Sequence, residues 1–108
     1  MFISGDDGVS LPLIAMGAVG IISVVGNAIP AIFSNMIRLC LEGKFDEARP
    51  LHYKILEFTN SLFLEGNPCG VKEALKHAGI CSNTLRLPLV NVGQELSNKI
   101  KEELKNLK

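Results

Sequence analysis

Two neighbouring aspartates, Asp6 and Asp7, are the residues of this chain with the most evident chemical potential. A pair of carboxylates can carry acid–base chemistry. Aspartates that precede a helix can instead cap it, by accepting hydrogen bonds from its free N–H groups. Because a short apolar helical pattern follows the pair, we favour capping for both residues. Asn27 can position a loop beside a pocket, although a turn residue is the simpler interpretation.

The cysteines and histidines do not form a recognisable metal-binding pattern. The three cysteines, Cys40, Cys69 and Cys81, are odd in number and share no Cys-x-x-Cys spacing. His52 and His77 lie outside any ligand pattern, so we expect no metal site and interpret both as packing or surface residues. Free thiols fit a reducing compartment, and the N-terminus lacks the basic region of a secretory signal. We therefore expect a cytoplasmic protein without a metal or cofactor.

Length and composition indicate a globular chain of one domain at most, or part of a larger one. It has 108 residues, of which 47% are hydrophobic and 20% are charged. Eleven basic and eleven acidic residues cancel, so the sequence predicts no broad basic face for nucleic acid. The Lys/Glu-rich tail, residues 99–108, is typical of the solvated face of a closing helix.

Residues 8–37 contain no charged side chain, but they do not read as a membrane anchor. A spanning helix needs about 20 uninterrupted apolar residues, and glycines and prolines divide this run. The breakers are Pro12, Gly17, Gly20, Gly26 and Pro30. Residues 21–25 are apolar and β-branched without alternation, which predicts a strand buried on both faces, as in a parallel sheet covered by helices.

The order of the predicted elements is strand, helix, strand, helix, and then three helices. Their ranges are 2–4, 9–16, 20–25, 31–42, 45–65 with a kink or late start at Pro50, 67–78 and 93–107, with a loop at 80–91. A short strand–helix–strand unit joins two parallel strands right-handedly. Because two strands do not make a stable sheet, we predict an α/β chain: residues 1–43 end a larger barrel, and 44–108 form a helical domain.

Five motifs occur in order along the chain. They are Ser4-Gly5-Asp6-Asp7, Gly17-Ala18-x-Gly20-x-Ile22-Ser23-Val24-x-x-Asn27-x-x-Pro30, Gly43-x-x-x-x-Ala48-Arg49, Asn67-Pro68-x-x-Val71-Lys72 and Leu85-Arg86-Leu87-Pro88-Leu89. Together they resemble the dihydrodipicolinate synthase family, (β/α)8-barrel lyases of lysine and diaminopimelate biosynthesis. The resemblance covers the last two barrel strands, their helices and the C-terminal three-helix region. At Cys69 and Gly70 the family usually has apolar and proline residues.

The resemblance implies a condensation of pyruvate with aspartate semialdehyde through a Schiff base on a lysine. In the family that lysine and the tyrosine of the proton relay lie on earlier strands. We therefore predict no catalytic residue in this chain and no activity for the chain alone. The resemblance also implies a homotetramer, with subunit contacts near residues 13–16.

Barrel active sites lie at the carboxyl ends of strands, which singles out residues 4–7 and 22–27. The resemblance implies that Ile22 places its backbone carbonyl beside pyruvate, and its side chain can also pack in a core. Gly5 would let the backbone approach the pocket, and Asp6 and Asn27 are possible pocket residues. Lys72 lies in a Gly-Val-Lys-Glu-Ala string like that around a Schiff-base lysine, but a helical pattern argues against catalysis there.

Two alternatives remain open at this point. Another pyruvate-dependent aldolase, such as an N-acetylneuraminate lyase, would share the same architecture. A non-catalytic helical interaction module would need a partner to cover the apolar strand. An isolated chain with uncovered strand edges should then associate with itself.

Overall fold

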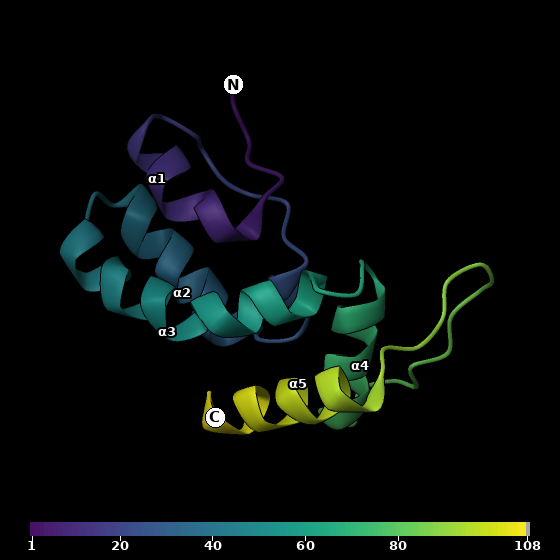
Figure 1. Cartoon of the computed structure of the whole chain (residues 1–108). Coiled ribbons are helices and arrows are strands. Elements are labelled where there is room, and N and C mark those ends of the chain that lie inside the picture. The colour runs from purple at the N-terminus through teal and green to yellow at the C-terminus, as the bar shows by residue number, and fades with distance from the viewer. Residues whose placement is uncertain (108) are drawn as a thin grey trace. The chain divides into compact units, whose positions relative to one another are not determined.

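The computed structural model describes residues 1–107 (Figure 1). The chain divides into two compact units, the first of residues 1–56 and the second beginning at Glu57. Helix α3, Phe45–Phe63, contributes residues to both. Within the described residues, no helix combines the length and the apolar character needed to cross a membrane.

The first unit begins with short helical elements around an uncharged segment. A 3₁₀ turn, η1 (Asp7–Val9), leads into α1 (Ser10–Ala15), and a second 3₁₀ turn, η2 (Val25–Asn27), leads into α2 (Pro30–Leu41). Proline is tolerated in the first turn of a helix because its missing N–H would have no partner there. Pro12 and Pro30 both occupy such positions, which agrees with the predicted helices at 9–16 and 31–42.

Helix α2 buries one face and ends at a glycine. Phe33, Met36 and Cys40 are its buried residues, at the i, i+3 and i+7 spacing of an amphipathic helix. Gly43 follows with a φ of 77°, a left-handed conformation that glycine adopts without steric cost. Lys44 N–H then donates to the Leu39 carbonyl over 2.8 Å, which closes the helix end.

The two predicted strands are much shorter than the sequence indicated. The described residues show one isolated parallel bridge, between Ser4 and Ile21, and no assigned strand. The parallel direction agrees with the prediction, and Ser4 N–H donates to the Gly20 carbonyl over 2.9 Å. The predicted strand at 20–25 is wrong in its length, because the chain adopts a helical conformation at Val24 and enters η2.

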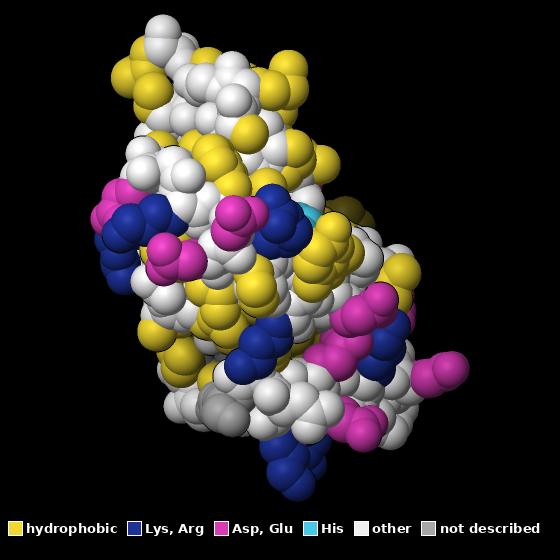
Figure 2. Space-filling view, turned by 90° about the vertical axis from the view of Figure 1, so that its left-hand side faces the viewer, with side chains coloured by type: hydrophobic (Ala, Val, Ile, Leu, Met, Phe, Trp, Pro, Cys, Tyr) yellow, Lys and Arg dark blue, Asp and Glu magenta, His cyan; other side chains and the backbone are white. Residues whose placement is uncertain are grey.

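This chain by itself does not bury the segment on both faces, and its predicted burial inside a larger barrel stays a prediction. The Ile22 side chain is 77% exposed, and only Val25 within residues 21–25 is buried. Phe2, Ile3 and Val19 are exposed as well. In the view of Figure 2, the upper part of the surface is hydrophobic and uncharged, whereas charged side chains occupy the middle and lower parts. The β-branched segment therefore finds no cover within its own unit.

Helix α3 begins at Phe45, before the late start at Pro50 that the sequence analysis gave as one alternative. It runs without interruption from Phe45, with Pro50 inside it, so the predicted late start is wrong. Asp46 and Glu47 occupy its first turn, where negative charge interacts favourably with the helix dipole.

The second unit packs α4 (Cys69–His77) against α5 (Gln94–Asn106). Both helices agree with the predicted ranges of 67–78 and 93–107 to within three residues. Val71 and Ala74 of α4 and Leu96, Ile100 and Leu104 of α5 are buried. The loop predicted at 80–91 extends away from the two helices (Figure 1).

Gly70 allows α4 to approach the end of α3. A Cβ atom at this position would lie 2.1 Å from the Leu62 carbonyl oxygen and 2.7 Å from its Cα, distances that real structures do not contain. The glycine that replaces a more usual residue in the Asn-Pro motif is therefore a packing requirement of this chain.

Candidate functional site

The site that the sequence indicated, residues 4–7 and 22–27, is brought together in the first unit. The bridge between Ser4 and Ile21 places the two segments side by side. Beyond the bridge, the Asp7 side chain bonds to the turn that begins at Ser23. Both candidate segments therefore belong to one hydrogen-bonded assembly.

The Asp7 carboxylate is the centre of that assembly. The residue is only 4% exposed. Its Oδ2 accepts hydrogen bonds from the N–H groups of Val24, at 3.0 Å, and Val25, at 3.3 Å. Its Oδ1 accepts from the Ser23 hydroxyl, and that hydroxyl oxygen accepts from Gly26 N–H over 2.7 Å. A buried carboxylate is tolerated when donors satisfy it, and here all of them come from the turn.

Ile22 has a fixed backbone and a free carbonyl. Its N–H donates to the Ser4 carbonyl over 2.9 Å, and the residues directly after it are held by Asp7. None of the described residues donates a hydrogen bond to the Ile22 carbonyl. Its side chain is 77% exposed and packs in no core of this chain, so the interpretation as a packed isoleucine of the intact barrel stays a prediction. The binding role of its carbonyl stays a prediction.

The other candidate residues of this site make turn and cap contacts. Asp6 Oδ1 accepts from Gly8 N–H over 3.0 Å and caps η1. Asn27 Nδ2 donates to the carbonyls of Ser23 and Val24, at 3.3 and 3.0 Å. The two aspartates thus serve different turns and do not share a proton-transfer site. A Cβ atom at Gly5 would meet no other atom within 4 Å, so the chain itself leaves open space there.

A second buried carboxylate, Glu73, lies in the second unit, and the sequence analysis did not single it out. The residue is 2% exposed. Its Oε1 accepts from the Ser97 hydroxyl at 2.6 Å and from Lys76 Nζ at 3.0 Å, and its Oε2 accepts from Asn83 Nδ2 at 2.7 Å. Burial raises the pKa of Glu73, but the hydrogen bonds from Ser97, Asn83 and Lys76 outweigh it and lower the pKa to about 2.

His77, Ser97 and Glu73 have the composition of a hydrolase triad but not its connectivity. His77 Nε2 lies 3.1 Å from the Ser97 carbonyl and 3.0 Å from its hydroxyl. The Ser97 hydroxyl donates its hydrogen to Glu73 Oε1 over 2.6 Å and not to the imidazole, whereas a triad needs the serine to donate to the histidine. Glu73 Oε1 lies 3.3 Å from the same Nε2, so both the carboxylate and the serine face one ring nitrogen, and Glu73 does not orient the imidazole through the other nitrogen. The cluster is structural, and the i, i+4 spacing of Glu73 and His77 on α4 is the sequence signal that could have indicated it.

The remaining chemically capable side chains are dispersed. Lys72 lies within α4, as the helical pattern predicted. Cys40 and Cys69 are buried and Cys81 is exposed, all as free thiols. Burial lowers the pKa of His52. Residues 1–107 contain no group of three histidine, cysteine or acidic residues placed to hold a metal ion.

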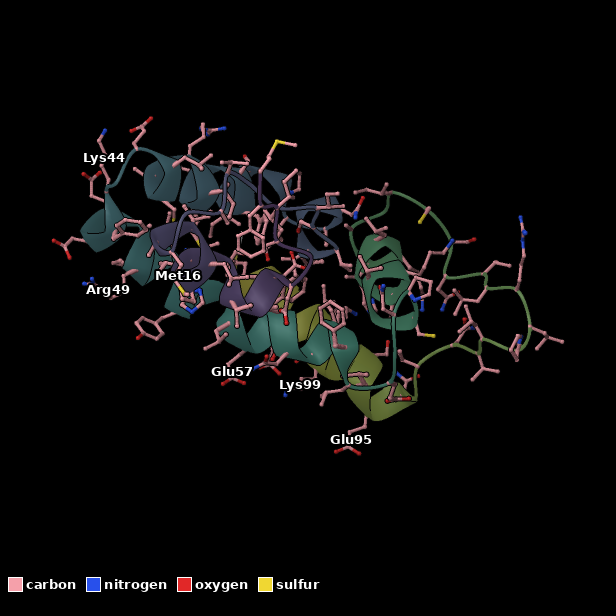
Figure 3. The ribbon with its side chains drawn as sticks, turned by 90° about the horizontal axis from the view of Figure 1, so that it is seen from above. Met16, Lys44, Arg49, Glu57, Glu95 and Lys99 are labelled. Atoms are coloured by element: carbon pink, nitrogen blue, oxygen red, sulfur yellow. The ribbon has the colours of Figure 1, made fainter. Side chains whose placement is uncertain are left out.

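An open depression of about 290 Å³ lies in the second unit. Its lining residues are Leu64, Glu65, Glu95, Leu96 and Lys99. Glu65 is engaged with Gly93 N–H over 3.0 Å, and Glu95 and Lys99 project outward from α5 (Figure 3). The charged side chains that line this depression are of both signs, and none of its lining residues is a buried polar group. The depression therefore shows no catalytic arrangement.

The sequence of this chain is similar to that of known synthases. Residues 1–107 match the family described as the Dihydrodipicolinate synthetase family. The 4-hydroxy-tetrahydrodipicolinate synthase of Flavobacterium psychrophilum is 50% identical over 100 residues, which make up 93% of this chain and 34% of that protein. The chain thus spans about a third of the length of the curated relatives that it matches.

Solved structures agree with the sequence relatives. The dihydrodipicolinate synthase from Aquifex aeolicus superposes with a TM-score of 0.93 at 43% identity, over 97% of this chain and 36% of that one. The chloride-inhibited enzyme from Acinetobacter baumannii, complexed with pyruvate, gives a TM-score of 0.91 at 34% identity, over 96% and 36%. The neighbours are barrel enzymes, as the sequence indicated, although the strand details are not reproduced here.

Proposed function

The chain belongs to the dihydrodipicolinate synthetase family, and we propose that it forms the C-terminal portion of a 4-hydroxy-tetrahydrodipicolinate synthase. The intact enzyme would be a lyase that condenses pyruvate with aspartate semialdehyde in lysine and diaminopimelate biosynthesis. Its Schiff-base lysine and relay tyrosine would lie in the upstream part. This chain would supply part of the pyruvate pocket and the C-terminal helices.

The observation that carries the proposal is the main chain at Ile22. Two parallel extended segments meet at Ser4 and Ile21, and none of the described residues donates a hydrogen bond to the Ile22 carbonyl that follows. An oriented carbonyl dipole can accept a hydrogen bond from a bound ligand or from a protonated catalytic group without further ordering. Gly5, in the adjacent segment, leaves room for a ligand to approach.

The proposed domain organisation follows the same architecture. Residues 1–43 would complete a (β/α)8 barrel, and 44–108 would form the C-terminal helical domain. The exposed apolar side chains of Phe2, Val19 and Ile22 are the kind that neighbouring strands and helices of a barrel cover. No residue of this chain would form the Schiff base, so the chain alone would be inactive.

The proposed assembly is a homotetramer in the cytoplasm. Met16, which directly follows α1 and is labelled in Figure 3, is 82% exposed. It lies in the segment where the family resemblance implies subunit contacts. Large exposed apolar side chains are typical of such interfaces.

Another pyruvate-dependent aldolase, such as an N-acetylneuraminate lyase, is the alternative within the same architecture. The named relatives favour the synthase. A helical interaction module without catalysis is the alternative of another class, supported by the uncovered apolar residues around Ile22. Light scattering tests that alternative, because a stable monomer at micromolar concentration contradicts an interface that needs a partner.

Borohydride trapping tests the main proposal. The chain should form no adduct with pyruvate by itself. Joined to the upstream two-thirds of the Aquifex aeolicus relative, it should yield an enzyme that is trapped by borohydride with pyruvate and that consumes aspartate semialdehyde. An adduct on Lys72 or any other lysine of this chain would contradict the proposal that the Schiff-base lysine lies in the upstream part. A folded hybrid that cannot be trapped would contradict the proposal itself.

A further inference from the structure

We propose that Asp7 is a positioning residue for the main chain of Ile22. Its carboxylate holds the turn after Ile22 in one conformation and thereby fixes the direction of the Ile22 carbonyl. The inference rests on the proposed function, in which that carbonyl lines the pyruvate pocket. It assigns to Asp7 a role in substrate binding through another residue, and not contact with the substrate.

The hydrogen bonds of Asp7 are concentrated on the residues that directly follow Ile22. Ser23 donates its hydroxyl, and Val24 and Val25 donate their N–H groups. An ionised carboxylate is only an acceptor, so the Ser23 hydroxyl must donate to it and is left to accept from Gly26. One carboxylate therefore orders four consecutive residues.

Among the described residues, no charged side chain forms an ion pair with Asp7. Residues 8–37, which include the whole turn, carry no lysine, arginine or acidic side chain. The donors of the turn therefore stabilise the buried Asp7 carboxylate, and the carboxylate in return holds the turn in place.

Ile22 is held from both sides. Ser4 accepts the Ile22 N–H over 2.9 Å, and Asp7 holds Ser23 and Val24 on the carboxyl side. Ser4 and Asp7 belong to the same short segment, which is ordered by bonds from the Ser4 hydroxyl to the Asp6 carbonyl and from Asp6 N–H to the Ser4 hydroxyl. The peptide between Ile22 and Ser23 thus cannot rotate without breaking bonds to this segment.

The test uses the hybrid with the Aquifex aeolicus upstream part and the substitution Asp7→Asn. The amide keeps the size of the side chain but turns one acceptor into a donor, which faces Ser23 or the N–H groups of Val24 and Val25. We expect the KM for pyruvate to rise about tenfold, equivalent to about 1.4 kcal/mol, with kcat within a factor of about two. A rise in KM at constant kcat indicates weaker binding of substrate and transition state alike.

Glu73→Gln is the matched control. It neutralises another buried carboxylate that accepts three side-chain hydrogen bonds, but in the second unit. It should lower the thermal midpoint at least as much as Asp7→Asn and leave the pyruvate KM unchanged. A KM that rises equally in both variants would mean general destabilisation and would overturn the inference.

Two further measurements keep the inference testable if Asp7→Asn fails to fold or if the hybrid is inactive. Ser23→Ala removes one of the donors and should raise the KM about threefold, a smaller fraction of the same binding energy. In the 108-residue chain, hydrogen exchange at Val24 and Val25 should be slow and should accelerate in Ser23→Ala. An active hybrid with unchanged KM, or unaltered exchange, contradicts the role of Asp7. Failure of the unsubstituted hybrid to react with pyruvate contradicts the proposed function alone.

Discussion

The two units of this chain each contain one buried carboxylate, and the two carboxylates organise different kinds of structure. Asp7 bonds to two backbone N–H groups and one serine within residues 23–25. Glu73 bonds to the side chains of Ser97, Asn83 and Lys76. Ser97 belongs to α5, Asn83 to the loop between α4 and α5, and Lys76 to α4 itself. Asp7 fixes the course of a backbone segment, whereas Glu73 joins separate elements.

This difference matters for the proposed function, in which the region around Asp7 contributes to substrate binding and the region around Glu73 does not. The turn held by Asp7 follows Ile22, whose carbonyl receives no hydrogen bond from the described residues and whose side chain is 77% exposed. Around Glu73, every polar partner is used within the cluster. Ser97 itself is buried, so a substrate cannot reach it. A satisfied polar network stabilises, and a fixed but unpaired group is available for binding.

The largest effect should come from removing the carboxylate of Glu73. Glu73→Ala leaves Ser97, Asn83 and Lys76 without their acceptor, and loss of one partner in a buried charged network costs about 4 kcal/mol. Urea unfolding followed by circular dichroism measures it. A loss below about 1 kcal/mol would show that the cluster behaves as an exposed ion pair.

Gly70→Ala should be the next most damaging change in the second unit. The added methyl group would overlap the Leu62 carbonyl, and forced overpacking costs about 3 kcal/mol. Gly66→Ala, at a positive φ with free space, is the control for loss of backbone freedom alone. Equal urea midpoints for the two variants would contradict a close approach of α4 to α3.

Acid should weaken the Glu73 cluster in a smaller effect, because protonation leaves the side chain in place. The pKa of Glu73 is lowered from 4.5 to about 2 in the folded chain. A depressed folded pKa contributes stability above pH 4.5, and that contribution is lost as the pH falls towards 2. Stability of the Glu73→Gln variant should therefore approach that of the unsubstituted chain over this range. A constant difference between pH 6 and pH 2.5 would contradict the assignment.

Ser23→Ala should cost about 1 kcal/mol, the net value of a typical hydrogen bond. It removes the bond to Asp7 and the acceptor for Gly26, but both backbone donors to Asp7 remain. The measurement is again the urea midpoint. A loss as large as that of Glu73→Ala would remove the contrast between the two carboxylates.

Lys76→Ala should have the smallest effect, about 0.5 kcal/mol, because half-exposed ion pairs contribute little. Ser97 and Asn83 still satisfy Glu73 in this variant. Addition of salt should reduce the difference further, since screening weakens exposed charge pairs. A salt-independent loss of several kcal/mol would show that Lys76 is an essential member of the cluster.

Helices and turns were the predictable part of this fold. The prolines at 12 and 30 and the glycine at 43 mark helix starts and an end by local sterics alone, and the structure places α1 and α2 accordingly. The extent of the strand at 20–25 was not predictable in the same way. Its β-branched residues favour an extended conformation, but the backbone turns at Val24, where it is bonded to a residue sixteen to eighteen positions away.

The candidate site divides along the same line. Its residues, from Gly5 to Asn27, could be selected from their types and from the family resemblance. The different hydrogen-bond partners of Asp6 and Asp7 could not be predicted, because nothing in the sequence distinguishes two adjacent aspartates before the chain folds. The Glu73 cluster escaped sequence analysis because its members are separated by up to 24 positions and each is common on a helix surface.

The amino-acid sequence by itself determined the helix boundaries, the absence of charge from residues 8–37 and the relationship to a barrel family, because these depend on local sterics and on residue order. The tertiary structure decided which carboxylate became buried, where the extended segment turns and which backbone carbonyl remains unpaired. Those outcomes depend on hydrogen bonds between residues distant in the chain, and such bonds exist only once the segments have been brought together.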